Sequence, residues 1–371
     1  MKIATVEATN IEIPYDVEYR PAWQPGLVRK SRDFTFVAIR TADGISGYAG
    51  TDGHRAGDIE RNVAPYLIGS EVWATERHQR VLRLAGGAWF LDQALADIIG
   101  KAAGLPLFKL WGGLRDRIPA YASTSELGNP EDRAELAHRY RTEGFRAIKI
   151  RFHKPTLAED LALYDAVAAA APDATVMVDA NQATSLPSPE PSPVWDYARA
   201  YRTARELQDR GALWLEEPLS RYDFENLVRL RESTEILIAG GESNRHLHEF
   251  RWLIEQGVYD VIQPDCSLSE GISQLRKIAG MAEMFERHFN PHHGLSGLGL
   301  AATIQLMCSV PSLGWLEMMY EPPTRTIEAY QRLGGILKST IFIDVDGQVR
   351  PPEGPGLGVE VDESMIQRYA V

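Results

Sequence analysis

Short apolar segments alternate with helical patterns over most of the chain. Eight such segments, rich in β-branched residues, recur from about residue 118, and each precedes a stretch with helical periodicity. The apolar segments are residues 117–123, 145–152, 174–181, 212–218, 235–242, 259–265, 287–293 and 314–320, and clear helical patterns cover 130–143, 197–211 and 272–287. This alternation predicts an α/β protein built on a (β/α)8 barrel. A doubly wound sheet would also alternate, but no glycine-rich phosphate fingerprint follows the early strands.

The two ends of the chain have a different pattern. Residues 3–14 and 34–50 alternate as strands, with a turn at Asp43-Gly44, and residues 85–113 predict a helix, a break and a second short helix. We therefore predict an α+β capping domain over residues 1–117, a barrel over 118–330, and a C-terminal segment, 331–371, that packs back on the cap. The Pro/Ser-rich residues 185–194 predict a loop before the third barrel helix.

Composition narrows the class of protein. Hydrophobic residues make up 44% and charged residues 24% of the 371, as in soluble globular proteins. No apolar run is long enough to span a membrane, the N-terminus lacks a signal-peptide pattern, and two cysteines give no disulfide framework, so we expect a cytoplasmic protein. The net charge of −12 argues against nucleic acid or an anionic membrane as partner. A small anionic substrate remains compatible, and we expect a homo-oligomer.

Polar residues follow six successive predicted strands. The carboxyl ends of barrel strands converge on one face, where active sites of this fold lie. A carboxylate at one strand end is usually a helix cap or a solvated group, but a series of them indicates a site. The series is Asp179 with Asn181, Glu216 with Glu217, Glu242, Asp265, His292 and Glu317.

Three of these strand ends carry carboxylates that would repel one another. Asp179, Glu242 and one of the neighbours Glu216 and Glu217 together favour a hard divalent cation. Oxygen ligands with positions left for water and substrate suit Mg²⁺ better than zinc, with manganese or calcium as alternatives. Spacing alone does not decide between Glu216 and Glu217.

Cations and a histidine pair complete the predicted site. Lys149 and Arg151 lie one residue apart in an apolar strand, so they share a face, which predicts contact with an anion rather than solvent. Asp265 and His292 come from neighbouring strand ends and predict a carboxylate–imidazole pair for moving protons. The metal and Lys149 would bind a substrate carboxylate and stabilise the negative charge formed when the α-carbon loses a proton.

At this point the sequence resembles the enolase superfamily, and within it the mandelate racemase subgroup. The resemblance extends over the whole chain and is most specific in residues 94–113 and in "MVDANQA", "LWLEEPL", "GGES", "VIQPD", "NPHHGLSGLGLAA" and "PPEGPGLGVEVDE". It implies Asp179, Glu216 and Glu242 as Mg²⁺ ligands and His292–Asp265 as the dyad, with His292 favoured over His293. It implies that Glu317 hydrogen-bonds the substrate carboxylate or the enolate oxygen.

The resemblance also implies substrate contacts from the cap, and this chain differs from the family pattern at one position. Cap loops that carry Arg20, Trp23 and His54 would reach the substrate, with Asn181 and His153 as further contacts. Many family members have Lys-x-Lys where this chain has Lys149-Ile150-Arg151. Arginine keeps its proton and is a poor base but a good carboxylate clamp, so chemistry on both faces of the substrate is in doubt.

These observations predict a Mg²⁺-dependent sugar-acid dehydratase, a carbon–oxygen lyase. His292 would remove the proton α to the carboxylate, and loss of the 3-hydroxyl through an enediolate would give a 2-keto-3-deoxy acid. One alternative is an epimerase, racemase or cycloisomerase of a related hydroxy acid. An alternative of another class is a catalytically silent barrel that binds metal or sugar.

Overall fold

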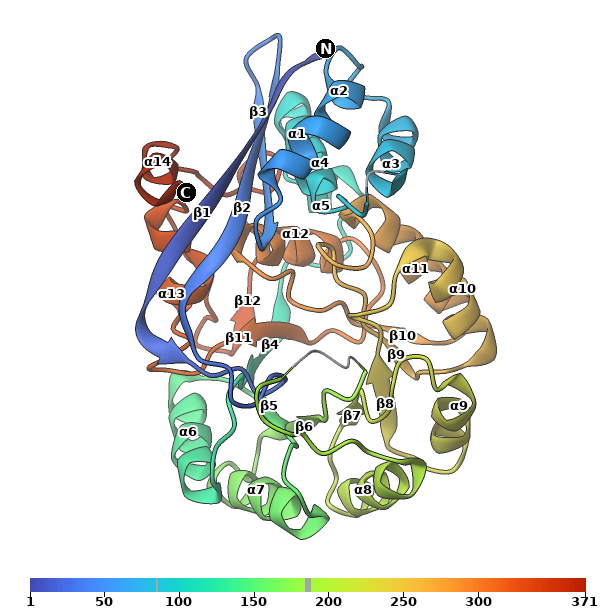
Figure 1. The fold of residues 1–371 in the computed structure, drawn as a ribbon. Helices are drawn as coiled ribbons and strands as arrows, with labels where there is room; N and C mark the ends of the chain where they lie inside the picture. Colours follow the sequence, from blue (N-terminus) through green and yellow to red (C-terminus); the bar gives the residue numbers. More distant parts are fainter. Residues whose placement is uncertain (85, 184–187) are drawn as a thin grey trace.

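The N-terminal region folds around a three-stranded antiparallel sheet (Figure 1). The computed structural model describes residues 1–84, 86–183 and 188–371. The strands are β1 (Ile3–Tyr19), β2 (Arg29–Thr41) and β3 (Ser46–Asp52), in the order β1-β2-β3. The predicted turn between β2 and β3 contains Gly44, whose φ of +85° suits glycine. Part of the loop predicted over 185–194 lies outside the described residues.

Helices cover this sheet and lead into the barrel. They are α1 (Ala56–Asn62), α2 (Ala64–Leu67), α3 (Thr75–Leu84), α4 (Leu91–Ala103) and α5 (Leu107–Leu110). Helix α4 ends at Gly104, which has left-handed geometry with φ of +67°. Pro106 then starts α5, so the predicted break separates two helices as expected.

Eight parallel strands form a curled sheet, in the order β11-β4-β5-β6-β7-β8-β9-β10 within the described residues. The backbone N–H of Leu313, just before β11, donates to the carbonyl of Phe289 in β10 at 2.8 Å, which links the two ends of the sheet. The strands are β4 (Ile118–Ser123), β5 (Ala147–Arg151), β6 (Thr175–Asp179), β7 (Trp214–Glu216), β8 (Leu237–Gly240), β9 (Val261–Ile262), β10 (His288–Phe289) and β11 (Leu316–Met319). This arrangement confirms the predicted barrel with its N-terminal cap.

A ring of helices surrounds the strands (Figure 1). They are α6 (Pro130–Glu143), α7 (Leu157–Ala170), α8 (Tyr197–Asp209), α9 (Phe224–Glu232), α10 (His246–Gln256), α11 (Ile272–Met284) and α12 (Gly297–Met307). Helix α7 starts with a capping box, in which Thr156 and Glu159 satisfy each other's free backbone N–H groups. Among the described residues, no helix is both long enough and apolar enough to cross a membrane.

The C-terminal segment contacts both parts of the molecule. After α13 (Ile327–Gln331) and a 3-10 turn (Leu333–Gly335), β12 (Gln348–Val349) pairs antiparallel with β4 of the barrel. Helix α14 (Ser364–Tyr369) then brings the chain to the cap, where Ala370 forms a bridge with Ile11 of β1. The hydroxyl of Tyr48 in β3 also donates to Glu363 at 2.7 Å.

Candidate active site

Strand register brings the predicted charged residues to the same edge of the barrel. Arg151 in β5 is paired with Asp179 in β6, and Asp179 is paired with Glu216 in β7. On the other side of β5, Lys149 is paired with Ser123 of β4. Because side chains alternate along a strand, this register turns Lys149, Arg151, Asp179 and Glu216 toward one another.

Lys149 is a fully buried cation among carboxylates. Its Nζ lies 2.8 Å from Glu216 Oε1, 2.9 Å from Glu317 Oε1 and 3.6 Å from Asp179 Oδ2. Burial alone would lower the pKa of Lys149, but these three carboxylates outweigh it and raise the pKa above its ordinary value. Lys149 therefore stays charged at neutral pH.

Arg151 is held by the protein on several sides. Its guanidinium forms an ion pair with Asp179 and donates to Ser123 Oγ at 3.2 Å and to the carbonyl of Thr124 at 2.7 Å. Burial would lower the pKa of Arg151, but Asp179 and the nearby glutamates raise it. Arg151 lines the cavity described below, but most of its donors already have acceptors in the protein.

Excess negative charge at the strand ends fits a hard divalent cation. Burial and repulsion from Asp179 raise the pKa of Glu216 to about 7, against the influence of Lys149. Burial and repulsion from Glu242 raise the pKa of Glu217 well above the usual range, and Glu217 Oε1 is buried without a hydrogen-bond partner. The side chains of Glu216 and Glu217 are therefore buried carboxylates, and a bound cation such as Mg²⁺ would relieve their repulsion from neighbouring carboxylates.

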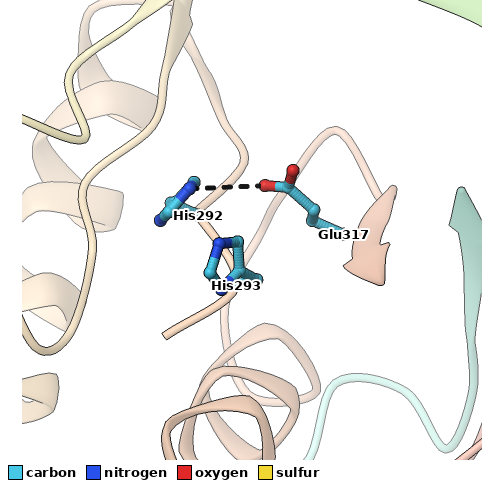
Figure 2. Close-up of side chains that lie close together, drawn as sticks. All are labelled: His292, His293 and Glu317. Atoms are coloured by element: carbon cyan, nitrogen blue, oxygen red, sulfur yellow. Dashed lines mark ion pairs between the residues drawn. The ribbon is translucent and has the colours of Figure 1, made fainter. Parts of the chain in front are cut away.

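A tighter potential ligand group lies nearby. Among the described residues, one set of His, Cys, Asp or Glu side chains has ligand atoms that all fall within 4.8 Å of one another: His292, His293 and Glu317 (Figure 2). The predicted trio Asp179, Glu216 and Glu242 does not form such a set among the described residues. Lys149 forms ion pairs with Asp179 and Glu216, and His292 forms one with Glu242. Two imidazoles suit transition metals, whereas carboxylate oxygens suit Mg²⁺.

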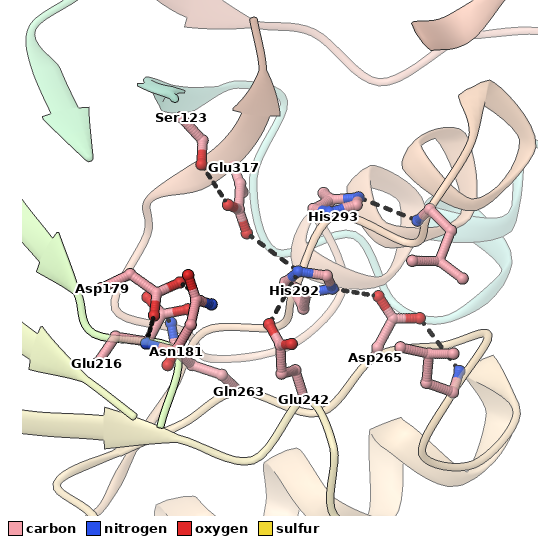
Figure 3. Close-up of polar contacts among 12 residues, drawn as sticks. Ser123, Asp179, Asn181, Glu216, Glu242, Gln263, Asp265, His292, His293 and Glu317 are labelled. Carbon is pink, nitrogen blue, oxygen red and sulfur yellow. Dashed lines mark hydrogen bonds and ion pairs between the residues drawn. The ribbon is translucent and has the colours of Figure 1, made fainter. Parts of the chain in front are cut away.

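His292 and Asp265 form the expected pair (Figure 3). His292 Nδ1 lies 2.6 Å from Asp265 Oδ2, and its Nε2 lies 3.0 Å from Glu242 Oε2 and 3.8 Å from Glu317 Oε2. Burial would lower the pKa of His292, but the carboxylates around it raise the pKa to about 10. Asp265 also accepts from the backbone N–H of Ser267 at 2.7 Å, which fixes its orientation.

The neighbouring His293 has a different environment. Its Nδ1 lies 2.5 Å from the Tyr330 hydroxyl and accepts from the backbone N–H of Leu295 at 3.0 Å. Burial and the adjacent His292 hold its pKa well below the usual value. His293 is therefore neutral, and the structure places His292 rather than His293 on Asp265.

Glu317 closes the site from β11. Its Oε1 accepts from Ser123 Oγ at 2.7 Å and lies beside Lys149. Burial would raise its pKa, but Lys149 and His292 hold it well below the usual range. Glu317 is therefore a carboxylate at neutral pH, and its Oε2 has no hydrogen-bond partner among the described residues.

A cavity of about 510 Å³ joins these strand ends to loops of the cap. Of the predicted substrate contacts, Arg151, Asn181 and Trp23 line it, and Arg151 lies 5.7 Å from the centre of the Trp23 ring. The lining residues are Trp23, Arg29, Thr51, Asp52, Arg151, Asn181, Arg221, Glu242, Ser243, Arg245, Leu268, His292, His293, Leu295, Met319, Arg325 and Tyr330.

Three predicted contacts lie outside this lining. Arg20 is exposed and forms an ion pair with Glu18, and His54 is exposed near Asp33. His153 is buried, its Nδ1 lies 3.2 Å from Ser192 Oγ, and burial lowers its pKa to about 4. The structure therefore does not bring Arg20, His54 or His153 to the cavity.

Other residues of the site were not predicted. Gln263 donates to Glu216 Oε2 at 3.1 Å, and its position two residues before Asp265 in the same strand motif was a usable signal. Arg221 and Arg245 follow the motifs of β7 and β8, and both line the cavity. Arg325, between β11 and α13, has no pattern in the sequence that indicates a site.

Comparison with known proteins identifies the family. The model described as "Enolase C-terminal domain-like" matches residues 132–365, and the model for the "Mandelate racemase / muconate lactonizing enzyme, N-terminal domain" matches residues 18–112. Together they cover most of the cap and the barrel from α6 onward.

Curated relatives match over nearly their full length. An arabinonate dehydratase of Saccharolobus solfataricus is 27% identical over 93% of this chain and 92% of its own. A D-galactonate dehydratase of Variovorax paradoxus is 32% identical over 89% of both chains. A D-galactarolactone cycloisomerase of Agrobacterium fabrum is 28% identical over 100% of this chain and 99% of its own.

Solved structures agree in fold. An enolase superfamily member from Polaromonas sp. JS666 has a TM-score of 0.86 at 30% identity, covering 100% of this chain and 98% of that one. A racemase from Streptomyces coelicolor A3(2), described with bound magnesium, has a TM-score of 0.83 at 26% identity and full coverage of both chains. This chain belongs to the enolase superfamily, in the group of mandelate racemase and muconate lactonizing enzyme.

Proposed function

We propose that the protein is a Mg²⁺-dependent dehydratase that acts on a small anionic substrate, a sugar acid, and forms a 2-keto-3-deoxy acid. The observation that carries the proposal is the His292–Asp265 pair on the cavity wall. Asp265 holds Nδ1 of His292, and Nε2 lies 3.0 Å from Glu242 and 3.8 Å from Glu317. Dehydratases of arabinonate and galactonate among the relatives support the same reaction type.

Asp179, Glu216 and Glu242 would hold the Mg²⁺, which would act as a Lewis acid on the substrate carboxylate. The buried oxygen donors and the raised pKa values of Glu216 and Glu242 support this assignment. A structural relative described with bound magnesium supports it as well.

His292 would move the protons. Asp265 keeps the Nδ1 proton in place. If Glu242 bound the metal instead of Nε2, His292 would lose the carboxylate that contributes most to its raised pKa, and the neutral imidazole would accept the α-proton at Nε2. The imidazolium formed in that step would then donate the same proton from Nε2 to the departing 3-hydroxyl, which leaves as water and returns His292 to its neutral form. Lys149, charged and buried, would stabilise the enediolate oxygens, and Glu317 would orient the carboxylate end of the substrate.

A cycloisomerase is the second candidate. One relative that matches over 100% of this chain is a D-galactarolactone cycloisomerase, and its name describes an isomerisation without loss of water. The same His292 could begin either reaction by removing an α-proton, so the product distinguishes them.

The test is a screen of mono- and dicarboxylic sugar acids with purified protein and Mg²⁺. We expect a 2-keto acid, detected as its semicarbazone, and no product from His292→Asn. A product of unchanged mass identified by NMR would favour the cycloisomerase. Turnover that persists after verified metal removal would contradict the metal assignment, and no metal-dependent turnover of any acid would favour a silent barrel.

A further inference from the structure

Arginines dominate the charged lining of the cavity. Among the described residues five arginines line it: Arg29, Arg151, Arg221, Arg245 and Arg325. Two carboxylates line it as well, and both are already engaged by cations. Asp52 lies 2.7 Å from Arg32, and Glu242 lies 3.0 Å from His292. The cavity therefore offers more positive charge than its own acids balance.

Arg325 is the most unusual of the five. It is 7% exposed, and its Nε and Nη1 have no hydrogen-bond acceptor within the described part of the chain. Its guanidinium carbon lies 4.2 Å from the centre of the Tyr19 ring and 5.9 Å from that of Tyr330. Aromatic faces attract the cation but accept none of its directed N–H bonds. Buried charges are normally paired, because leaving them unpaired is costly.

The other free arginines are better satisfied. Arg245 Nη1 donates to the backbone carbonyls of Glu242 and Asn244 at 3.0 and 3.1 Å. Arg221 donates to the Tyr222 hydroxyl at 2.7 Å. Arg151 is paired with Asp179. Arg29 donates to Gln24 Oε1 at 2.9 Å. Of the five arginines, Arg325 combines deep burial, two donor nitrogens without an acceptor among the described residues, and a place on the cavity wall.

We propose that Arg325 binds a second carboxylate of the substrate, so that the substrate is a dicarboxylic sugar acid rather than a monocarboxylic one. This inference rests on the proposed function, in which the first carboxylate lies at Lys149 and the metal. Guanidinium and carboxylate match as a two-bond pair along the Nε–Nη2 or the Nη1–Nη2 edge, so a carboxylate supplies an acceptor to one of the two nitrogens that lack one. The cavity volume of about 510 Å³ is within the usual range for small-molecule sites.

The experiment compares two acids that differ at one end. Wild-type enzyme with Mg²⁺ is given a dicarboxylic acid and the monocarboxylic acid of the same configuration, and kcat and KM are measured for each. We expect the dicarboxylic acid to be preferred. Arg325→Met should reduce that preference by about 30- to 100-fold, mainly through KM, since a buried charge-assisted pair is lost. The preference of Arg325→Lys for the dicarboxylic acid should lie between that of the wild type and that of Arg325→Met.

Three controls make the result specific. Arg251→Gln removes an exposed arginine, paired with Glu255 on α10, and should leave both acids unaffected. Arg245→Gln removes another lining arginine and should change the preference less than Arg325→Met. Thermal unfolding of each variant shows whether it is folded. If Arg325→Met does not fold, Arg325→Lys replaces it in the comparison of the two acids.

The outcomes separate this inference from the reaction itself. A wild-type preference for the monocarboxylic acid, or an equal loss for both acids in Arg325→Met, would overturn the dicarboxylate inference and leave the dehydratase standing. If neither acid reacts, the proposed reaction fails, and calorimetric binding of glutarate and butyrate tests the site alone. Glutarate binding weakened in Arg325→Met would still support a carboxylate site, and unchanged glutarate affinity would overturn it.

Discussion

Lys149 is a buried ammonium group whose charge the surrounding carboxylates require. Removing one member of a buried ion pair leaves the partners uncompensated and commonly costs about 3–5 kcal/mol. Lys149→Met should therefore lower the free energy of unfolding by about that amount, measured in denaturant without metal, as well as abolish turnover. The cost arises because Glu216 and Glu317 lose the cation within 3 Å of each.

Lys277→Met is the matched control for Lys149→Met. Lys277 pairs with Glu76 on the surface, where both side chains are exposed, so its loss should change stability by less than about 1 kcal/mol. Equal effects of the two substitutions would show that the ion pairs around Lys149 contribute no special stability.

In the proposed reaction, Arg151 would determine which face of the substrate can lose a proton. Because its carboxylate neighbours raise its pKa despite burial, Arg151 keeps its proton, and His292 would be the base in the proposed mechanism. In deuterium oxide, NMR should show exchange at C2 of one epimer of the substrate, and His292→Asn should abolish it. If the wild type exchanged deuterium into C2 of both epimers, a second base would be present, and the racemase alternative would be favoured.

At the scale of elements, the register of β6 and β7 predicts which glutamate binds metal. Glu216 is paired with Asp179 across the two strands, while Glu217 follows the end of β7 and has a left-handed φ of +46°. Glu216→Gln should therefore weaken Mg²⁺ binding more than tenfold, and Glu217→Gln much less, as measured by calorimetry. The reverse order would assign the metal to the unpaired carboxylate of Glu217.

The barrel strands were predictable because parallel strands that are buried on both faces appear in the sequence as short, nearly continuous apolar runs. The strand-end residues followed from them, since period-two alternation fixes which side chains share a face. The cap contacts were not predictable in the same way. Trp23 reaches the cavity while Arg20, three residues earlier, is exposed, because a loop's course depends on packing that no periodicity records. Arg325 was missed for the same reason.

At the scale of the whole molecule, Asp92 ties the cap to the barrel. From α4 it accepts hydrogen bonds from Gln79 in the cap at 2.5 Å and from the backbone of Ser273 in α11 at 2.7 Å. Burial is the main cause that raises its pKa from 3.8 to about 6. Its contribution to folding is therefore greatest below pH 3.8 and is lost as the pH rises through about 6.

Asp92→Asn should remove this dependence. The unfolding free energy of the wild type minus that of the variant should fall by about 2.5 kcal/mol between pH 4 and pH 8, because most of the effect of a shift of about two pKa units lies in this range. The variant can keep its contacts, because Gln79 Oε1 has no partner and can accept from the new amide after a flip of the Gln79 amide group. A difference that stays constant with pH would show that Asp92 ionises normally.

The bridge between Ile11 and Ala370 has a consequence for synthesis on the ribosome. β1 is an edge strand, and the residues that bond to its outer side, Ala370 and Val371, are separated from it by nearly the whole chain. While the barrel is being translated, part of that edge has its backbone groups open to other nascent chains. Molecular chaperones that shield early β-strands should therefore matter more for the yield of this protein than for a barrel whose cap is completed locally.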